Sequence, residues 1–239
     1  MNGKQLKNSI LQWAIQGKLV PQDPNDEPAS VLLERIRAEK ARLVKEKKIK
    51  KDKNESIIYR GEDNSYYEKF LATREVKCID EEIPFEIPAT WEWCRLLSIV
   101  SLLGDGIHGT PEYSEGGSVY FINGNNLFDG QILIKPDTKT VSKEEAVKHS
   151  RLLNESTVLV SINGTIGNIA FYSGENVILG KSACYFNLLN GIERKYIKIV
   201  LQTDYFLEYT KRVATGSTIK NVPLSGMRNV LIPIPPKDE

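Results

Sequence analysis

Short runs of β-branched and aromatic residues, separated by glycine, asparagine and aspartate, dominate the chain between residues 119 and 189. Runs of this length with turn-forming residues at both ends are typical of β-strands. We therefore expect strands at residues 119–122, 131–135, 157–162, 168–172 and 183–189, and a last one in the proline-bounded sequence VLIPIPP. Two segments have apolar residues at helical spacing instead, which predicts helices at 143–150 and 193–213. Together these elements predict an α+β or α/β domain built around one mixed sheet.

The first 50 residues have a different pattern. Apolar residues recur at helical spacing over residues 4–16, and Gly17 follows them where glycine commonly ends a helix. A turn rich in proline and aspartate comes next, and Pro28 is suited to the first turn of a second helix. We therefore expect a helical arm over residues 1–50.

Residues 51–90 are polar, and their charge changes from basic to acidic along the segment. Isolated aromatic residues such as Tyr59 and Phe70 predict an extended polar connector that lies on a surface. Two tryptophans then provide large apolar anchors for the domain that follows. The chain is thus divided into a helical arm, a connector and one larger domain, at residues 1–50, 51–90 and 91–239.

Composition excludes a membrane protein. No apolar run in the 239 residues approaches the roughly 18 residues that a membrane span needs, and the N-terminus lacks the apolar core of a signal peptide. The three cysteines are widely spaced without a CxxC pair, which predicts reduced thiols in a cytoplasmic protein. The net charge of +1 does not indicate a nucleic-acid partner. Residues 34–53 carry ten Lys and Arg against four Asp and Glu. This basic stretch is either a solvated helix face or a DNA contact.

The glycine-rich loop LLGDGIHGTPEY at residues 102–113 raises the question of catalysis. Its GDGIHG sequence matches neither the dinucleotide-binding GxGxxG pattern nor the Walker sequence. His108 has no cysteine or histidine near it at metal-ligand spacing. The sequence shows no Ser-His-Asp pattern and no recognisable carboxylate pair, so we expect neither catalytic activity nor a bound metal. His108 then either makes a local hydrogen bond or contacts a ligand.

Two further glycine-rich segments have the composition of loops. SINGTIGNIAF at residues 161–171 predicts a hairpin turn whose glycines take positive φ, and its backbone amides are also suited to phosphate. ATGSTIKNVPLSGM at residues 214–227 combines hydroxyl side chains with a lysine, after a helix whose end carries Lys211 and Arg212. This second segment is either an ordinary polar connector or a surface that contacts a nucleic-acid backbone.

The order of these segments resembles a known family. The sequence LKNSILQWAIQGKLVPQDPNDEPASVLLERIRAEKARLVKEKKIKK resembles the N-terminal segment of specificity subunits of type I restriction–modification enzymes. The rest follows the order of one target recognition domain of that family: TWEWCRL, GDGIHGTPEY, VYFINGNNL, VSKEEA, LVSINGTIGNIAFY, TGSTIKNVPLSGM and LIPIPP. Each motif is weak alone, but the ordered set covers nearly the whole chain and is specific.

The resemblance implies a DNA-binding specificity subunit without catalysis of its own. In this family, two target recognition domains each read one half of a bipartite DNA site, held apart by helices that pair as a coiled coil. It implies double-stranded DNA and the methyltransferase and restriction subunits as partners. It implies no cofactor on this chain, because S-adenosylmethionine, ATP and magnesium bind other subunits.

The chain has a single recognition domain, so we expect a half-length or truncated form. A homodimer would supply the second domain for a bipartite site. The alternative, from another functional class, is a protein-interaction module that acts through the helical arm and does not bind DNA.

The candidate functional residues fall into two sets. Asparagine pairs with adenine edges, and lysine, hydroxyl and glycine-turn groups contact phosphate. On this basis and the resemblance we predict DNA contacts at His108, Thr110, Tyr113, Asn123, Asn125, Asn126, Gly164, Thr165, Lys211, Arg212, Ser217, Thr218, Lys220 and Asn221. On the apolar side of the arm we predict contacts with other subunits at Leu6, Ile10, Trp13, Leu32, Ile36 and Leu43.

Overall fold

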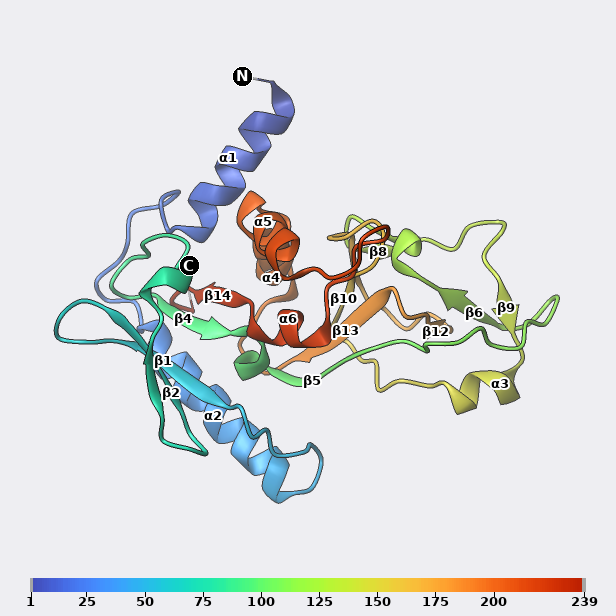
Figure 1. Cartoon of the computed structure of the whole chain (residues 1–239), viewed down its shortest axis with the longest axis horizontal. Coiled ribbons are helices and arrows are strands. Elements are labelled where there is room, and N and C mark those ends of the chain that lie inside the picture. Colours follow the sequence, from blue (N-terminus) through green and yellow to red (C-terminus); the bar gives the residue numbers. More distant parts are fainter. Residues whose placement is uncertain (1, 238–239) are drawn as a thin grey trace.

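A computed structural model describes residues 2–237 (Figure 1). The helices are α1 (Gly3–Ile15), α2 (Ala29–Lys45), α3 (Lys143–Lys148), α4 (Arg194–Leu201), α5 (Asp204–Val213) and α6 (Leu224–Asn229), with 3-10 turns η1 (Asp80–Glu82), η2 (Leu96–Ile99) and η3 (Gly124–Asn126). The strands are β1 (Ser56–Arg60), β2 (Tyr66–Phe70), β3 (Val76–Cys78), β4 (Glu92–Arg95), β5 (Val100–Asp105), β6 (Val119–Ile122), β7 (Leu127–Phe128), β8 (Gln131–Ile132), β9 (Thr140–Val141), β10 (Thr157–Ser161), β11 (Ile169–Phe171), β12 (Val177–Leu179), β13 (Ala183–Leu188) and β14 (Leu231–Ile234). The outer limits of the predicted regions, at residues 1 and 238–239, lie outside the described residues.

A four-stranded antiparallel sheet, in the order β11-β10-β13-β5, lies at the centre of the fold. Strands β10 and β13 are buried over their whole length, as expected for the middle of a sheet that is covered on both faces. Beside it, the sheet β12-β6-β9 combines a parallel and an antiparallel pair. The predicted combination of helices and strands in an α+β fold is therefore confirmed, but the strands form several sheets and not the one mixed sheet that we expected.

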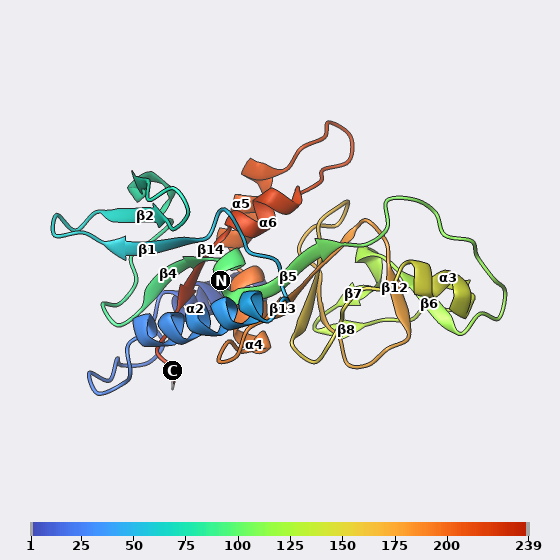
Figure 2. The same cartoon turned by 90° about the horizontal axis from the view of Figure 1, so that it is seen from below.

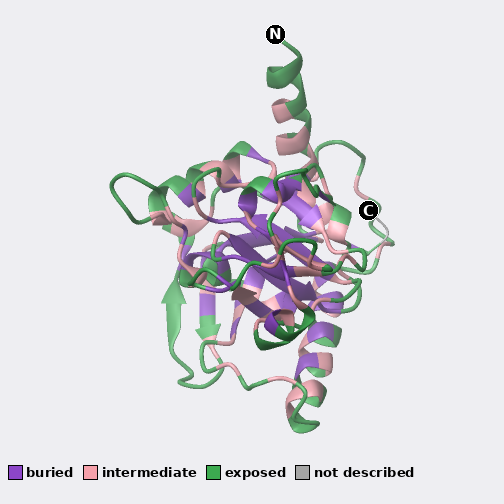
Figure 3. Cartoon of the chain, turned by 90° about the vertical axis from the view of Figure 1, so that its right-hand side faces the viewer, coloured by how far each residue is buried: buried purple, intermediate pink, exposed green. Residues whose placement is uncertain are grey.

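The strands β4 and β14 form a separate antiparallel pair, in which Glu92 lies opposite Ile234 and Arg95 opposite Leu231. The first and last strands of the predicted larger domain are thus neighbours. Helices α4, α5 and α6 contribute Val200, Phe206 and Met227, all fully buried, to the same apolar core as the central sheet. Figure 3 shows this buried material in the middle of the molecule and exposed residues over its outer loops. Among the described residues, the helices are all too short or too polar to span a bilayer.

The two helices of the arm have different environments. Helix α1 begins with a capping box between Asn2 and Gln5, ends before Gly17 at φ +64° as predicted, and projects from the body in Figure 1. Helix α2 packs along the body and buries Leu32 and Ile36 in the main core (Figure 2). The arm is therefore not a separate helical unit, because α2 is part of the core.

Residues 56–78 form a three-stranded antiparallel sheet, β1-β2-β3, where we expected an extended connector. A tight turn joins the first two strands, with the Gly61 amide donating to the Ser65 carbonyl at 2.8 Å and Asn64 at φ +66°. The small sheet is tied to the body by Arg95, whose guanidinium lies 2.6 Å from Glu68 and 2.8 Å from Glu82. These tethers lie far apart in sequence, so local composition did not reveal the sheet.

Three other elements differ from the expectation. The long helix predicted at 193–213 is broken into α4 and α5 at the fully buried Thr203, whose hydroxyl accepts a hydrogen bond from the Phe206 amide at 3.4 Å. The strand predicted at 131–135 is limited to β8. Residues 102–105, which we expected within a loop, continue strand β5.

Gly106 lies where the chain leaves β5 and crosses β12. A Cβ atom on Gly106 would lie 2.0 Å from the Leu179 carbonyl oxygen, to which the Ile107 amide donates at 2.8 Å. We expect Gly106→Ala to lower the free energy of unfolding by about 1–3 kcal/mol, measured by urea denaturation, because backbone atoms would have to move apart. Gly109→Ala is the control, because nothing lies within 4 Å of its Cβ position. Equal losses for the two variants would contradict this explanation.

Candidate nucleic-acid interface

Four polar loops from separate parts of the chain meet on one surface, here called the loop face. They are residues 123–126, 161–168, 180–182 and 214–222. The Ser182 hydroxyl accepts from the Gly124 amide at 2.8 Å and donates to the Asn123 side chain at 2.9 Å, which joins the first and third loops. The Asn168 side chain donates to the Gly124 carbonyl at 3.3 Å, which connects the second loop to the first.

The second and fourth loops are joined directly. The Asn163 side-chain amide donates to the Asn221 side-chain oxygen at 3.2 Å, and the Gly164 backbone amide donates to the Lys220 carbonyl at 3.2 Å. Gly164 and Gly167 have φ of +70° and +93° in the turn between β10 and β11, which confirms the predicted hairpin turn. The loop face is thus a hydrogen-bonded surface rather than a set of independent loops.

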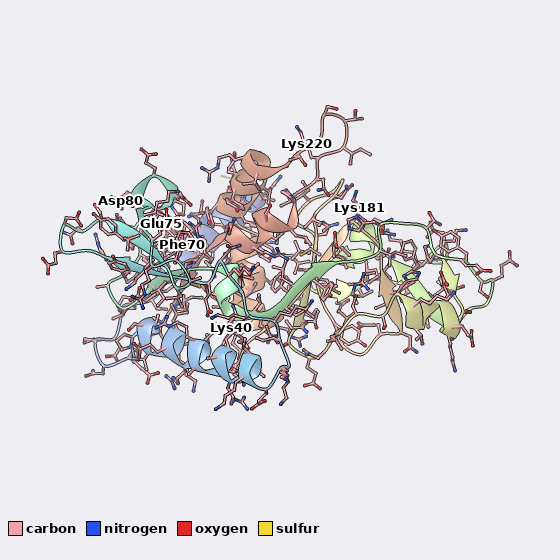
Figure 4. The ribbon with its side chains drawn as sticks, turned by 60° about the horizontal axis from the view of Figure 1, so that its bottom comes forward. Lys40, Phe70, Glu75, Asp80, Lys181 and Lys220 are labelled. Carbon is pink, nitrogen blue, oxygen red and sulfur yellow. The ribbon has the colours of Figure 1, made fainter. Side chains whose placement is uncertain are left out.

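Basic side chains lie on or beside the loop face. Lys211 and Lys220 line one pocket of about 290 Å³ between α5 and the second and fourth loops. Lys211 lies 2.6 Å from Glu208, but both side chains are more than half exposed, so this pair restrains the lysine little. Arg212 is also exposed. Lys220 and Lys181 both lie along the upper side of the molecule in Figure 4.

Lys181 was not among the predicted contacts. It is exposed in the sequence Gly-Lys-Ser between β12 and β13, directly before the Ser182 that joins two of the loops. A lysine between two small residues, directly before the strand predicted at 183–189, was the available signal. The loop became part of the surface only through the contacts of Ser182 with residues almost 60 positions earlier.

The segment that follows β5 adjoins the loop face. The Ile107 amide donates to the Leu179 carbonyl and Ile107 bridges to Gly180, which places Ile107 and the adjacent His108 next to the third loop. Thr110, two residues further along, is exposed. The His108 imidazole is exposed and lies 2.8 Å from the Asp105 carboxylate, so it makes the local contact that we considered as one possibility. Tyr113 is exposed, with its ring 6.0 Å from that of Phe121.

Not every predicted DNA contact is accessible. Asn126 is only 5% exposed, and its side chain accepts from the Asn123 amide and donates to the Leu133 carbonyl at 2.9 Å. It therefore holds the turn η3 together and cannot reach a base, which corrects our expectation. Asn125 next to it is exposed. The other predicted contacts on the loop face remain at the surface: Gly164, Thr165, Ser217, Thr218, Lys220 and, partly covered, Asn123 and Asn221.

The predicted subunit contacts divide in the same way. Leu6, Ile10 and Trp13 are 41–49% exposed and form an uncovered stripe on α1. Leu32 and Ile36 are buried in the chain's own core, and Leu43 is half-buried against it. Leu32 and Ile36 cannot present a surface to another subunit, so the expectation for these two residues is corrected.

Glu145 in helix α3 holds the segment that follows His108. Its carboxylate accepts from Lys148 at 2.8 Å and from the Glu112 backbone amide at 3.0 Å. These hydrogen bonds lower the pKa of Glu145 from 4.5 to about 2. Since the folded pKa is depressed, the stabilisation is present above about pH 4.5 and is lost as pH falls toward 2.

We expect Glu145→Gln to lower the Tm at pH 6, and this difference from the native chain to shrink as pH approaches 2. Thermal melting followed by circular dichroism across this range measures the effect. Glu155→Gln, an exposed carboxylate without a role at this segment, serves as the control. A difference that stays constant with pH would show that the Glu145 charge is not involved.

Neither the buried cysteines nor the acidic and histidine side chains of the described residues are arranged for covalent or metal chemistry. Burial raises the pKa of the Cys94 and Cys184 thiols, which makes both poor nucleophiles. Within residues 2–237, no group of three or more His, Cys, Asp or Glu side chains is arranged to hold a metal ion. What the loop face offers is hydrogen-bond donors and acceptors next to positive charge, which is the chemistry of nucleic-acid recognition.

Comparison with known proteins identifies the family. Residues 88–239 match the Type I restriction modification DNA specificity domain. The chain is 32% identical over 241 residues to the Type I restriction enzyme EcoAI specificity subunit of Escherichia coli, an alignment that covers 98% of this chain and 37% of that protein. It is 28% identical over 241 residues to the EcoEI specificity subunit of Escherichia coli, covering 97% of this chain and 37% of that one. The chain thus spans little more than a third of the length of these relatives.

Solved structures with some likeness include the S subunit of a type I restriction–modification system from M. genitalium, at 20% identity and a TM-score of 0.41, covering 60% of this chain and 34% of that one. The HsdS subunit from Thermoanaerobacter tengcongensis has 17% identity and a TM-score of 0.46, covering 65% of this chain and 36% of that one. The family match over residues 88–239 takes in most of the chain, including the whole loop face. The chain therefore belongs to the type I restriction–modification DNA specificity domain family.

Proposed function

We propose that this chain is a non-catalytic DNA-recognition subunit that reads one half of a bipartite DNA site for a type I restriction–modification complex. The observation that carries the proposal is the match of residues 88–239 to the DNA specificity domain, together with the loop face in that region. Relatives that align over almost the whole chain are specificity subunits by name. Recognition through protein loops requires no cofactor on this chain.

Different residues on and beside the loop face suit the phosphates and the bases of DNA. Lys181, Lys211, Arg212 and Lys220 supply positive charge that suits phosphates, and the exposed hydroxyl of Thr165 is a further donor. The Gly164 backbone amide is already used, because it donates to the Lys220 carbonyl. Side chains such as Asn125, Thr110 and Tyr113 project from adjoining loops and are our proposed base contacts. Each well-formed base contact would contribute roughly 1–3 kcal/mol of discrimination between sequences.

The exposed stripe on α1 supports a second part of the proposal. Three large apolar side chains on one side of a projecting helix favour burial against another polypeptide. We assign this stripe to contacts with the methyltransferase and restriction subunits, or with a second copy of the chain that would provide the other half-site reader. It is also what remains of the helical-arm interaction surface, now that Leu32 and Ile36 are placed in the core.

Selection from a random pool of DNA duplexes tests the proposal, using the chain assembled with its methyltransferase subunits. We expect enrichment of a split motif, and a change of one half of that motif when residues 91–239 are exchanged for those of a relative. The methyltransferase subunits without this chain are the control. A pool that shows no enriched motif, or a motif that survives the exchange, would overturn the proposal.

A further inference from the structure

One edge of β5 is not paired with another strand among the described residues. Strand β5 is the last strand of the central sheet, and within residues 2–237 no strand pairs with its outer side. Its sequence VSLLGD contains no proline or lysine, the residues by which proteins commonly protect exposed edges. An edge of this kind exposes backbone donors and acceptors that can pair with another chain.

A groove of about 740 Å³ runs along this edge, and we call it the basic groove. Four successive residues of β5, Val100 to Leu103, line it. Because alternate side chains of a strand point to opposite faces, successive residues can line one groove only along the strand's edge. Further apolar surface comes from Leu43, Leu97 and Leu152, of which Leu152 is 75% exposed.

The opposite wall is strongly basic. The segment after α2 supplies Lys48, Lys50 and Lys51, and passes beside β5 in Figure 2. Arg228 on α6 adds an exposed cation, against the single carboxylate of Asp52. Lys40 on α2 (Figure 4) also lines the groove, but it is 5% exposed and donates to the Leu97 carbonyl at 2.6 Å. Lys48 is paired with Glu46 at 2.8 Å, whereas Lys50, Lys51 and Arg228 form no salt bridge among the described residues. The groove therefore combines a strand edge, apolar surface and excess positive charge.

We propose that the basic groove binds an extended, acidic segment of a partner protein, which adds a strand to β5. Main-chain hydrogen bonds to the edge would hold the segment, its apolar side chains would cover the leucines, and its carboxylates would face the lysines. A second copy of this chain does not fit, because two basic walls would face each other. Duplex DNA does not fit either, since it offers no strand to the edge and leaves the apolar surface uncovered.

The test uses the full chain and an acetylated, amidated peptide of sequence EVEVEVEV, with KVKVKVKV as the charge-reversed probe. We expect EVEVEVEV to slow hydrogen exchange of the amides between Val100 and Asp105 at least fivefold, and KVKVKVKV to have no effect. The double variant Lys50→Glu/Lys51→Glu should weaken peptide binding at least tenfold. Arg228→Glu, an exposed position on another element, should weaken it as well.

The matched control is Lys143→Glu/Lys195→Glu, which makes the same charge change at exposed lysines outside the groove and should leave peptide binding unchanged. Equal loss in the control, binding without protection of β5, or protection of β5 by duplex DNA in place of the peptide would each overturn the proposal. Duplex binding is measured with the same variants. Loss of DNA recognition with intact peptide binding would count against the proposed function alone, because the groove and the loop face consist of different residues.

Discussion

Arg95→Ala is expected to lower the free energy of unfolding by about 3–5 kcal/mol, because it leaves a buried carboxylate without its cation. The Arg95 side chain is 11% exposed and lies 2.6 Å from the Glu68 carboxylate, which is 5% exposed. After the substitution, the hydrogen bond from the Ser56 hydroxyl at 2.6 Å is what would remain to the Glu68 carboxylate among residues 2–237. The same arginine contacts Glu82 in η1, so the small sheet and the turn that follows it would each lose an ion pair to the body at once.

Urea denaturation measures this loss, and Arg60→Ala is the control. Arg60 pairs with Glu86 at 3.6 Å, but both side chains are exposed, so we expect its removal to cost within about 1 kcal/mol. The double variant Arg95→Met/Glu68→Leu should recover much of the stability, since neither charge is then left buried. If Arg95→Ala costs no more than Arg60→Ala, the ion pairs do not anchor the small sheet.

Lys211→Ala combined with Lys220→Ala is expected to weaken DNA binding roughly thirtyfold at about 0.15 M salt, at every sequence tested. The estimate follows from the release of counterions when two phosphates are neutralised, which contributes about 0.9 per phosphate to the slope of log affinity against log salt. The slope should therefore fall by about 1.8, while the ranking of preferred sequences stays the same. Fluorescence anisotropy with labelled duplexes over a series of salt concentrations measures both quantities.

The control for this pair is Lys143→Ala/Lys195→Ala, which removes two exposed lysines outside the loop face. Its salt slope should match that of the native chain. An unchanged slope in the Lys211/Lys220 variant would rule out phosphate contacts at these positions. A loss restricted to one sequence would instead assign the two lysines to base contacts.

The elements that sequence analysis predicted well are those whose determinants are local. The end of α1 at Gly17 and the β10–β11 turn with Gly164 depend on backbone conformations that neighbouring residues specify. The small sheet at residues 56–78 was missed because it depends on Arg95, and the break in the long helix depends on burial of Thr203. These long-range contacts leave no periodic pattern in the sequence.

The same limit applies to the candidate site. Helical spacing predicted correctly that Leu32 and Ile36 lie on one apolar side of α2, but not that the chain's own core would cover it. Asn126 and Asn125 have the same chemistry, and only the turn η3 makes the first internal and the second exposed. The loops could be identified singly, whereas the hydrogen bonds that join them, such as that between Asn163 and Asn221, cross 58 positions of sequence.

The pairing of β4 with β14 has a consequence for how the part of the chain between them can vary. Because Glu92 lies opposite Ile234, the segment between β4 and β14 begins and ends at neighbouring positions in space. Loops between these two strands can therefore change in length, or be replaced together by recombination, without altering the distance between β4 and β14. Such a replacement has to preserve β4, β14 and the apolar surface against which α2 packs. In this arrangement the loop face can change while the two strands that connect it to the rest of the chain stay constant.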